Sequence, residues 1–129
     1  MIQTAEEFIL LVEKNDPRAK NDNISNLVCD LIIQKYPEYK ICILQNKNVP
    51  IQVIRTLSQD KDPKVRFWVA QKRKCPEDIL KKLSTDPDIS VKERIAWNPK
   101  TKNDILEILE KDACLKISKL ASQRLKNLT

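Results

Sequence analysis

The sequence predicts an all-α fold, in which about four two-helix repeats stack as an α-solenoid behind an N-terminal capping helix. The first observation is a period of 26 residues, at which the same residue types return. It is visible in three leucines and three aspartates: Leu57, Leu83, Leu109, Asp60, Asp86 and Asp112. The second is the helical spacing of apolar residues within a period, as in Val65 and Val69, four positions apart.

The N-terminal segment departs from this period. Thr4 and Glu7 have the spacing of a capping box before Phe8, which predicts that a helix begins near residue 4. A polar link from Asn15 to Asn23 follows, and it is longer than the other turns. We therefore expect residues 1–23 to form a cap over the open end of the repeats.

Residues 24–112 are predicted to hold the repeats, beginning with a helix over residues 24–35. Its apolar residues stand one period before those of a later helix: Leu27 before Val53, Val28 before Ile54, and Leu31 before Leu57. This alignment predicts that all three are buried, with Asn23 as the N-cap. Residues 113–129 are predicted to be a C-terminal capping half-repeat with a helix over 115–127. We expect one domain over residues 1–129.

Proline and capping residues mark the predicted helix boundaries. Proline at the first helical position, after a capping residue, is expected to start helices at Val49–Pro50, Asp62–Pro63 and Cys75–Pro76. Thr101 and Asp104 have the spacing of a capping box, with Asp in place of the usual Glu. Asn98 is expected to end the preceding helix, because a residue before proline avoids the α region.

The composition excludes several classes of function. Among 129 residues there is no glycine, so a phosphate-binding glycine loop is not available. There is no histidine either, which removes the commonest general base and metal ligand. The four cysteines fall at different phases of the period and form no CxxC pair, which favours free thiols. We expect no catalytic residues, no metal and no cofactor.

The segment from Asp86 to Thr101, DPDISVKERIAWNPKT, resembles the variant leucine-rich repeat, a relative of HEAT-like helical repeats. That family reads DP-D, then V-R-x-x-V-A-x-N-P-x-T-P, then an L-x-x-L helix. The resemblance extends over residues 37–125 and implies a right-handed stack of helices with an interaction role. The period is 26 rather than the family's roughly 24 residues. The cysteine cluster that holds an iron–sulphur centre in one member is missing, so no cluster is expected.

Positive charge gathers in one repeat. Residues 61–82 carry eight basic and three acidic side chains, in a chain of net charge +6. The basic residues proposed to face a partner are Lys64, Arg66, Lys72, Arg73 and Lys74. Such a surface attracts acidic peptides or phosphates. The alternative is a solvated face that serves solubility.

Aromatic residues interrupt this basic repeat. Phe67 shares its phase with Glu93 and Lys119, which favours a solvent-facing position and a role as a binding anchor. Packing of Phe67 against a neighbouring helix is the alternative. Trp68 is expected at the edge of the core, and it is proposed to face the partner together with Phe67. Trp97 shares its phase with glutamines and is a weaker candidate for the same binding role.

Cys75 is the one candidate for thiol chemistry. It precedes a predicted helix and follows three cations, and both features favour the thiolate. The alternative is a small residue tolerated at a position that holds Val49 or Thr101 in other repeats.

We therefore expect a non-catalytic protein–protein interaction module that is not an enzyme, with a partner and an oligomeric state that the sequence leaves open. The alternative is a nucleic-acid-binding helical-repeat protein that uses the basic repeat over residues 61–82. The N-terminus lacks the basic start and the long apolar stretch of a signal peptide, and no stretch reaches the roughly 20 apolar residues of a membrane span. A cytoplasmic location without membrane contact is the resulting expectation.

Overall fold

The computed structural model describes residues 1–127 of the chain. Over that range it contains ten α-helices, one 3₁₀ helix and no strand, apart from an isolated bridge between Ile2 and Ile24. The predicted all-α class is confirmed. The chain divides into two compact units, Met1–Gln59 (unit 1) and Asp60–Thr129 (unit 2). A single domain over residues 1–129 stays a prediction.

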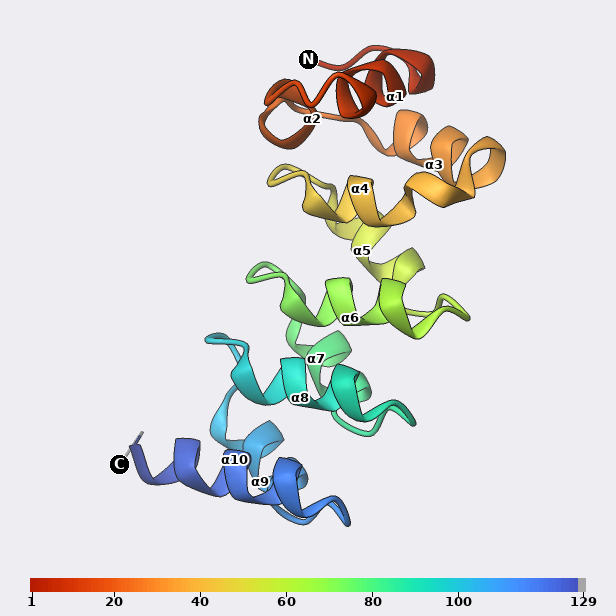
Figure 1. Cartoon of the computed structure of the whole chain (residues 1–129). Helices are drawn as coiled ribbons and strands as arrows, with labels where there is room; N and C mark the ends of the chain where they lie inside the picture. The colour runs from red at the N-terminus through yellow and green to blue at the C-terminus, as the bar shows by residue number, and fades with distance from the viewer. Residues whose placement is uncertain (128–129) are drawn as a thin grey trace. The chain divides into compact units, whose positions relative to one another are not determined.

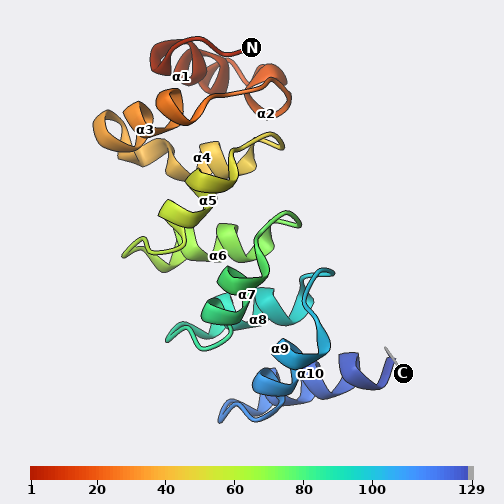
Figure 2. The ribbon, with the colours of Figure 1, turned by 180° about the vertical axis from the view of Figure 1, so that it is seen from behind.

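Unit 1 contains five α-helices and the 3₁₀ helix, which Figures 1 and 2 show from opposite sides. The elements are α1 (Ala5–Glu13), α2 (Arg18–Asn21), α3 (Asn26–Lys35), η1 (Pro37–Tyr39), α4 (Lys40–Gln45) and α5 (Ile51–Leu57). The hydroxyl of Thr4 accepts a hydrogen bond from the backbone N–H of Glu7 at 3.0 Å, so the predicted cap of α1 is confirmed. The carboxylate of Glu7 accepts from the N–H of Gln3.

The predicted register of α3 is wrong by one residue. Val28 is buried as expected, but Leu27 is 70% exposed and Leu31 is 37% exposed. Cys29 and Ile32 occupy the core positions instead. The reason is that α3 begins at residue 26 and α5 at residue 51, one residue short of a full period.

The predicted cap of α3 is also wrong. Ser25 is the N-cap, and its hydroxyl accepts from the N–H of Val28 at 3.2 Å. The carbonyl of Asn23 instead accepts from the N–H of Ile2 at 2.9 Å, which ties the N-terminal strand-like segment to the start of α3. The backbone before α3 is therefore used for pairing, and the cap lies two residues later.

Unit 2 repeats the same helix pair. Its elements are α6 (Pro63–Gln71), α7 (Glu77–Leu83), α8 (Ile89–Trp97), α9 (Asn103–Glu110) and α10 (Leu115–Asn127). The first helices begin at residues 63, 89 and 115, and the second helices at 77 and 103, so both sets keep the 26-residue period. Helix α8 packs between α6 and α10, and α9 packs on α10 (Figure 1). Helix α10 has the bounds predicted for the C-terminal helix.

The core of unit 2 follows the period predicted for it. Apolar side chains at equivalent phases of the repeats are buried. The equivalent sets are Val65, Val91 and Ile117; Val69, Ile95 and Ala121; Ile79 and Ile105; Leu80 and Leu106; and Leu83 and Leu109. Each large member stabilises the fold by about 1.5–3 kcal/mol relative to an exposed position. The remaining residues of α6, α8 and α10 do not contribute to this core.

Two of the predicted helix ends in unit 2, at Asp62–Pro63 and at Asn98, are confirmed. Asp62 caps α6 by accepting from the N–H of Lys64 at 2.9 Å, with Pro63 at the first helical position. Asn98 ends α8 in an extended conformation. At α5 and α7, however, the proline itself is the N-cap, and the helix begins one residue later.

The predicted capping box at Thr101 is wrong. Lys102 is the N-cap of α9, with no side-chain cap. Thr101 is 4% exposed, and its hydroxyl donates to the carbonyl of Ile95 at 2.7 Å. A buried hydroxyl must find a buried partner, and a carbonyl in the last turn of α8 supplies it.

Side-chain amide and guanidinium groups join successive first helices of unit 2. The amide nitrogen of Asn98 donates to the carbonyls of Ala70 at 2.8 Å and Lys72 at 3.0 Å. One period later, Arg124 donates to the carbonyls of Ala96 and Asn98. These bonds satisfy carbonyls at the C-terminal ends of α6 and α8, which lack partners within their own helices.

Candidate functional site

Helices α6 and α8 also carry side chains that are not buried in the core. The two helices pack directly on each other, and their buried positions are filled by valine, isoleucine and alanine. Phe67 and Arg94 are half-buried, and Trp97 is 55% exposed. Among the aromatic residues, all of which lie within residues 1–127, Trp97 alone is largely exposed to solvent. We call Phe67, Gln71, Arg94 and Trp97 the α6–α8 face.

Arg94 is the centre of this face. Its guanidinium carbon lies 5.2 Å from the centroid of the Phe67 ring, an attractive cation–π geometry. Phe67 in turn meets Trp68 edge to face, with ring centroids 6.3 Å apart and an interplanar angle of 81°. Arg94 and the two rings are therefore held in a fixed arrangement across α6 and α8.

The charge of Arg94 has no carboxylate partner within residues 1–127. Its side chain makes no hydrogen bond there, and its Nε is buried without an acceptor. The nearby Glu93 is occupied, because its carboxylate pairs with Lys116 at 2.9 Å. Since Nε is the single buried side-chain nitrogen or oxygen without a partner in that range, the two Nη groups keep contact with solvent.

A shallow hollow of about 140 Å³ lies beside this guanidinium. It is lined by Gln71, Arg94, Trp97, Asn98 and Pro99. The Asn98 side chain is fully engaged by backbone groups, since its oxygen also accepts from the N–H of Lys100. Within the part of the chain that the structure describes, the side-chain polar groups of the lining without a hydrogen-bond partner are the guanidinium, the Trp97 indole N–H and the Gln71 amide. These are mainly hydrogen-bond donors.

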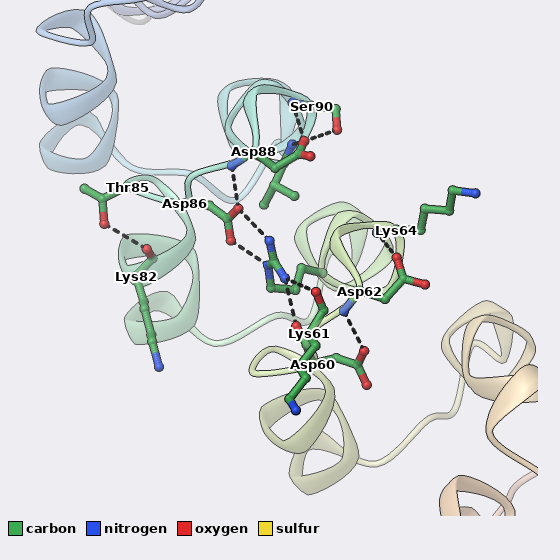
Figure 3. Close-up of polar contacts among 11 residues, drawn as sticks. Asp60, Lys61, Asp62, Lys64, Lys82, Thr85, Asp86, Asp88 and Ser90 are labelled. Atoms are coloured by element: carbon green, nitrogen blue, oxygen red, sulfur yellow. Dashed lines mark hydrogen bonds and ion pairs between the residues drawn. The ribbon is translucent and has the colours of Figure 1, made fainter.

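Arg66, predicted to face a partner, is bound within the fold. Its Nε and Nη2 reach the two carboxylate oxygens of Asp86 at 2.8 and 3.2 Å. Its Nη1 donates to the carbonyls of Asp60 and Lys61 at 2.8 and 3.1 Å, and Figure 3 shows these acceptors around one point. The Asp86 carboxylate also accepts from the N–H of Asp88. This guanidinium has its hydrogen-bonding capacity used inside unit 2.

The other predicted cations are spread over two places. Lys64 is exposed on α6. Lys72 is half-buried at the end of α6, where burial lowers the pKa of its ammonium group. Arg73 and Lys74 are exposed in the α6–α7 turn. They therefore do not form one cluster with Phe67 and Trp97.

The turns of unit 2 separate charge by side. The α6–α7 and α8–α9 turns lie on the same side as the end of α10 in Figure 1, and they carry Arg73, Lys74 and Lys100. The α7–α8 and α9–α10 turns lie on the opposite side and carry Asp86, Asp88 and Asp112, with Lys111 as their one basic residue. We call the first side the basic edge.

Cys75 is placed unfavourably for thiol chemistry. It precedes α7 as expected, but it is 5% exposed. Reactive thiols combine a lowered pKa with access to solvent, and this thiol has little access. None of the cysteines within residues 1–127 forms a disulfide, and burial raises the pKa of Cys29 to about 12. Reactivity of Cys75 stays a prediction, which burial disfavours.

Arg94 and Gln71 were missed by sequence reasoning. Arg94 lies one period after Trp68, and Gln71 lies one period before Trp97. The sequence therefore showed only that the residue type at these two positions varies between repeats. A usable signal was the spacing of Arg94 three residues before Trp97, which places both on one helix face. The absence of an acidic partner could not be read from the sequence.

In residues 1–127, no group of three or more acidic, cysteine or histidine side chains is arranged to hold a metal ion. None of the helices described is long and apolar enough to cross a membrane. Comparisons with protein-family models, with curated proteins and with solved structures find no match for this chain.

Proposed function

We propose that the chain is a right-handed α-solenoid of about four two-helix repeats that binds another protein through the α6–α8 face. The repeat part of this proposal is supported by the helix starts in unit 2, which recur every 26 residues. It is also supported by two equivalent ion pairs, Arg66 with Asp86 and Lys92 with Asp112, each at 2.8 Å. Repeats of this kind generally present an extended surface to a partner.

The observation that carries the binding proposal is the exposure of Trp97 next to Arg94. Burying a tryptophan side chain in a core is favourable, yet Trp97 is 55% exposed on a helix whose Val91, Ile95 and Ala96 are buried. Tryptophan and arginine are the residue types most enriched at binding hot spots. A protein partner that covers Trp97 would bury this ring and desolvate the neighbouring guanidinium.

The proposal is tested by capture followed by reconstitution. Wild type, Trp97→Ala and Ile89→Ala are used to capture proteins from the source cells, and each captured protein is then purified and titrated by calorimetry. Ile89 is the matched control, because it lies on the same helix and is 50% exposed. We expect Trp97→Ala to weaken binding by about 30-fold, which corresponds to a hot-spot residue. Equal affinities of all three proteins for every purified partner would contradict the proposal.

Nucleic-acid binding is the second candidate, and it is favoured by the basic edge. Arg73, Lys74 and Lys100 are all exposed there, and the opposite turns hold the aspartates. Phosphate contacts would make affinity fall steeply with salt, with a slope of about −0.9 per neutralised phosphate on duplex DNA. A shift assay with random duplex and single-stranded oligonucleotides separates the two functions. No binding at low salt removes this candidate, whereas binding that Arg73→Gln/Lys74→Gln weakens and Trp97→Ala does not would support it.

A further inference from the structure

We infer that the hollow beside Arg94 receives a carboxylate side chain of the protein partner, so that the partner docks an acidic segment on the α6–α8 face. This inference rests on the proposed function and specifies the chemistry of the partner. It starts from the state of Arg94, a half-buried cation with neither an ion pair nor a hydrogen bond in the part of the chain that the structure describes.

An unpaired cation at this depth is unusual in this protein. Arg66 has four hydrogen bonds to oxygen acceptors, and Arg124 donates to two carbonyls. Arg94 has the Phe67 ring alone, which attracts the cation but leaves every N–H without an acceptor. The two Nη groups therefore have no protein acceptor to give up, and a charge-assisted hydrogen bond from them to an incoming carboxylate would be gained without breaking an existing one.

The geometry of the guanidinium selects the ligand group. Its Nε is covered, whereas the two Nη groups keep contact with solvent. Two parallel N–H donors at the end of a planar guanidinium match the two oxygens of a carboxylate. The Phe67 ring, 5.2 Å from the guanidinium carbon, restricts the orientation of that plane.

The surroundings of the hollow favour the same ligand. Its unpartnered groups are the Arg94 guanidinium, the Trp97 indole N–H and the Gln71 amide, of which only the amide oxygen accepts. The volume of about 140 Å³ equals that of roughly four or five waters at liquid density, which is room for the end of an acidic side chain. No acidic residue lines the hollow.

A peptide carboxylate fits this surface better than a nucleic-acid phosphate. Phosphate backbones are held by several cations along a track, and Arg94 is the single cation in the lining. The exposed indole of Trp97 offers apolar contact beside the charge, which suits a mixed acidic and apolar peptide. Lys100 follows the lining residue Pro99 in sequence, and its charge would attract an acidic segment at longer range.

In the test, a display library of random 12-residue peptides is selected for binding to the wild-type protein. Peptides that also bind Trp97→Ala are removed by counter-selection. The enriched peptides are expected to share an Asp or Glu. Changing that residue to Asn or Gln in a synthetic peptide should weaken binding to the wild type by about tenfold or more. Arg94→Gln should remove this difference, because it no longer distinguishes a carboxylate from an amide.

Two further variants separate the possible causes. Arg94→Lys keeps the charge and loses the paired donors, and we expect an intermediate preference for the acidic peptide. Arg73→Gln removes an exposed cation outside the hollow and should keep the full tenfold preference. Circular dichroism of every variant establishes that the fold is retained.

Each other outcome overturns the inference in a recognisable way. Peptides that need Trp97 but bind equally in acid and amide forms would leave the proposed function in place and reject the carboxylate. A selection that yields no Trp97-dependent peptide would reject the binding face and the inference together. An oligonucleotide that binds the wild type but not Arg94→Gln would reassign the hollow to phosphate.

Discussion

Unit 1 and unit 2 each contain a buried asparagine that makes equivalent hydrogen bonds, but the ion pairs of the two units differ in burial. In unit 1 the amide of Asn46 donates to the carbonyls of Ala19 at 2.8 Å and Asp22 at 2.9 Å. In unit 2 Asn98, two periods later, does the same with the carbonyls of α6. A bidentate amide that ends a helix and holds the preceding one is therefore common to both units.

The charged contacts differ. In unit 2 the Arg66–Asp86 pair is largely buried, with side chains 14% and 5% exposed. In unit 1 the Arg18–Asp16 pair, which joins two residues of one turn, leaves the arginine side chain 63% exposed. Exposed pairs contribute little to stability, whereas breaking a buried pair leaves an uncompensated charge. The comparison therefore indicates that the Arg66–Asp86 pair contributes more to the stability of unit 2 than the Arg18–Asp16 pair contributes to that of unit 1.

The largest effect is expected for Arg66→Met. It leaves the Asp86 carboxylate without its guanidinium and two carbonyls without their donor, so we expect a loss of about 3 kcal/mol. Urea unfolding followed by both tryptophan fluorescence and circular dichroism measures it, because Trp68 and Trp97 report unit 2 and the circular dichroism reports the helices of both units. Arg18→Met is the matched control and should leave the midpoint of unfolding nearly unchanged. Equal effects of the two substitutions would remove the distinction between the units.

The asparagines are expected to be next in size. Asn98→Ala leaves two carbonyls at the end of α6 without their donor and should cost about 2 kcal/mol. Asn46→Ala should cost a similar amount in unit 1 for the same reason. Hydrogen exchange by mass spectrometry assigns each loss to its unit. If Asn46→Ala has no effect on exchange in α2 and α4, the two asparagines are not equivalent.

The Lys92–Asp112 pair should give a smaller and pH-dependent effect. The ammonium group of Lys92 holds the pKa of Asp112 below its ordinary value of 3.8. A lowered folded-state pKa contributes stability above the ordinary pKa, and that contribution is lost as the pH falls through the folded value. We expect Asp112→Asn to cost about 1 kcal/mol at neutral pH and progressively less below about pH 4.

A thermodynamic cycle with Lys92→Met isolates the ion pair. The two single variants together should lose more stability than the double variant, because each single change leaves one charge without its partner. The pair is weaker than Arg66–Asp86 because Lys92 makes one bond at 2.8 Å and reaches no backbone carbonyl. A difference between wild type and Asp112→Asn that persists unchanged at pH 3 would contradict this assignment.

The sequence predicted the core of unit 2 because the 26-residue period is kept there without offset. The aspartates that recur with this period lie in turns. Asp60, Asp86 and Asp112 each accept from the N–H two residues later, at 2.8–2.9 Å. The same alignment failed at Leu27 and Leu31, since one residue is missing between α3 and α5. A one-residue offset rotates a helix by about 100°, which exchanges buried and exposed positions.

The candidate site was predictable only in part. Trp97 and Phe67 were recognised as departures from their phase, because composition at one position is visible in the sequence. The roles of Arg66 and Arg94 were not separable, since both are arginines on first helices of their repeats. What distinguishes them is whether an acidic residue reaches across the next turn. Asp86 does so for Arg66, and no carboxylate in the described residues does so for Arg94.

The smallest effect is expected for Tyr39→Phe in unit 1. The phenol donates to the Glu13 carboxylate at 2.7 Å, and this bond raises the pKa of Tyr39 to about 12. Both groups are in contact with water, so the carboxylate left behind is hydrated and loses little. We expect the urea midpoint, followed by circular dichroism, to stay within error of the wild type, and hydrogen exchange in α1 to rise slightly. A loss as large as that of Asn46→Ala would show that unit 1 also depends on a charged contact, which would end the contrast with unit 2.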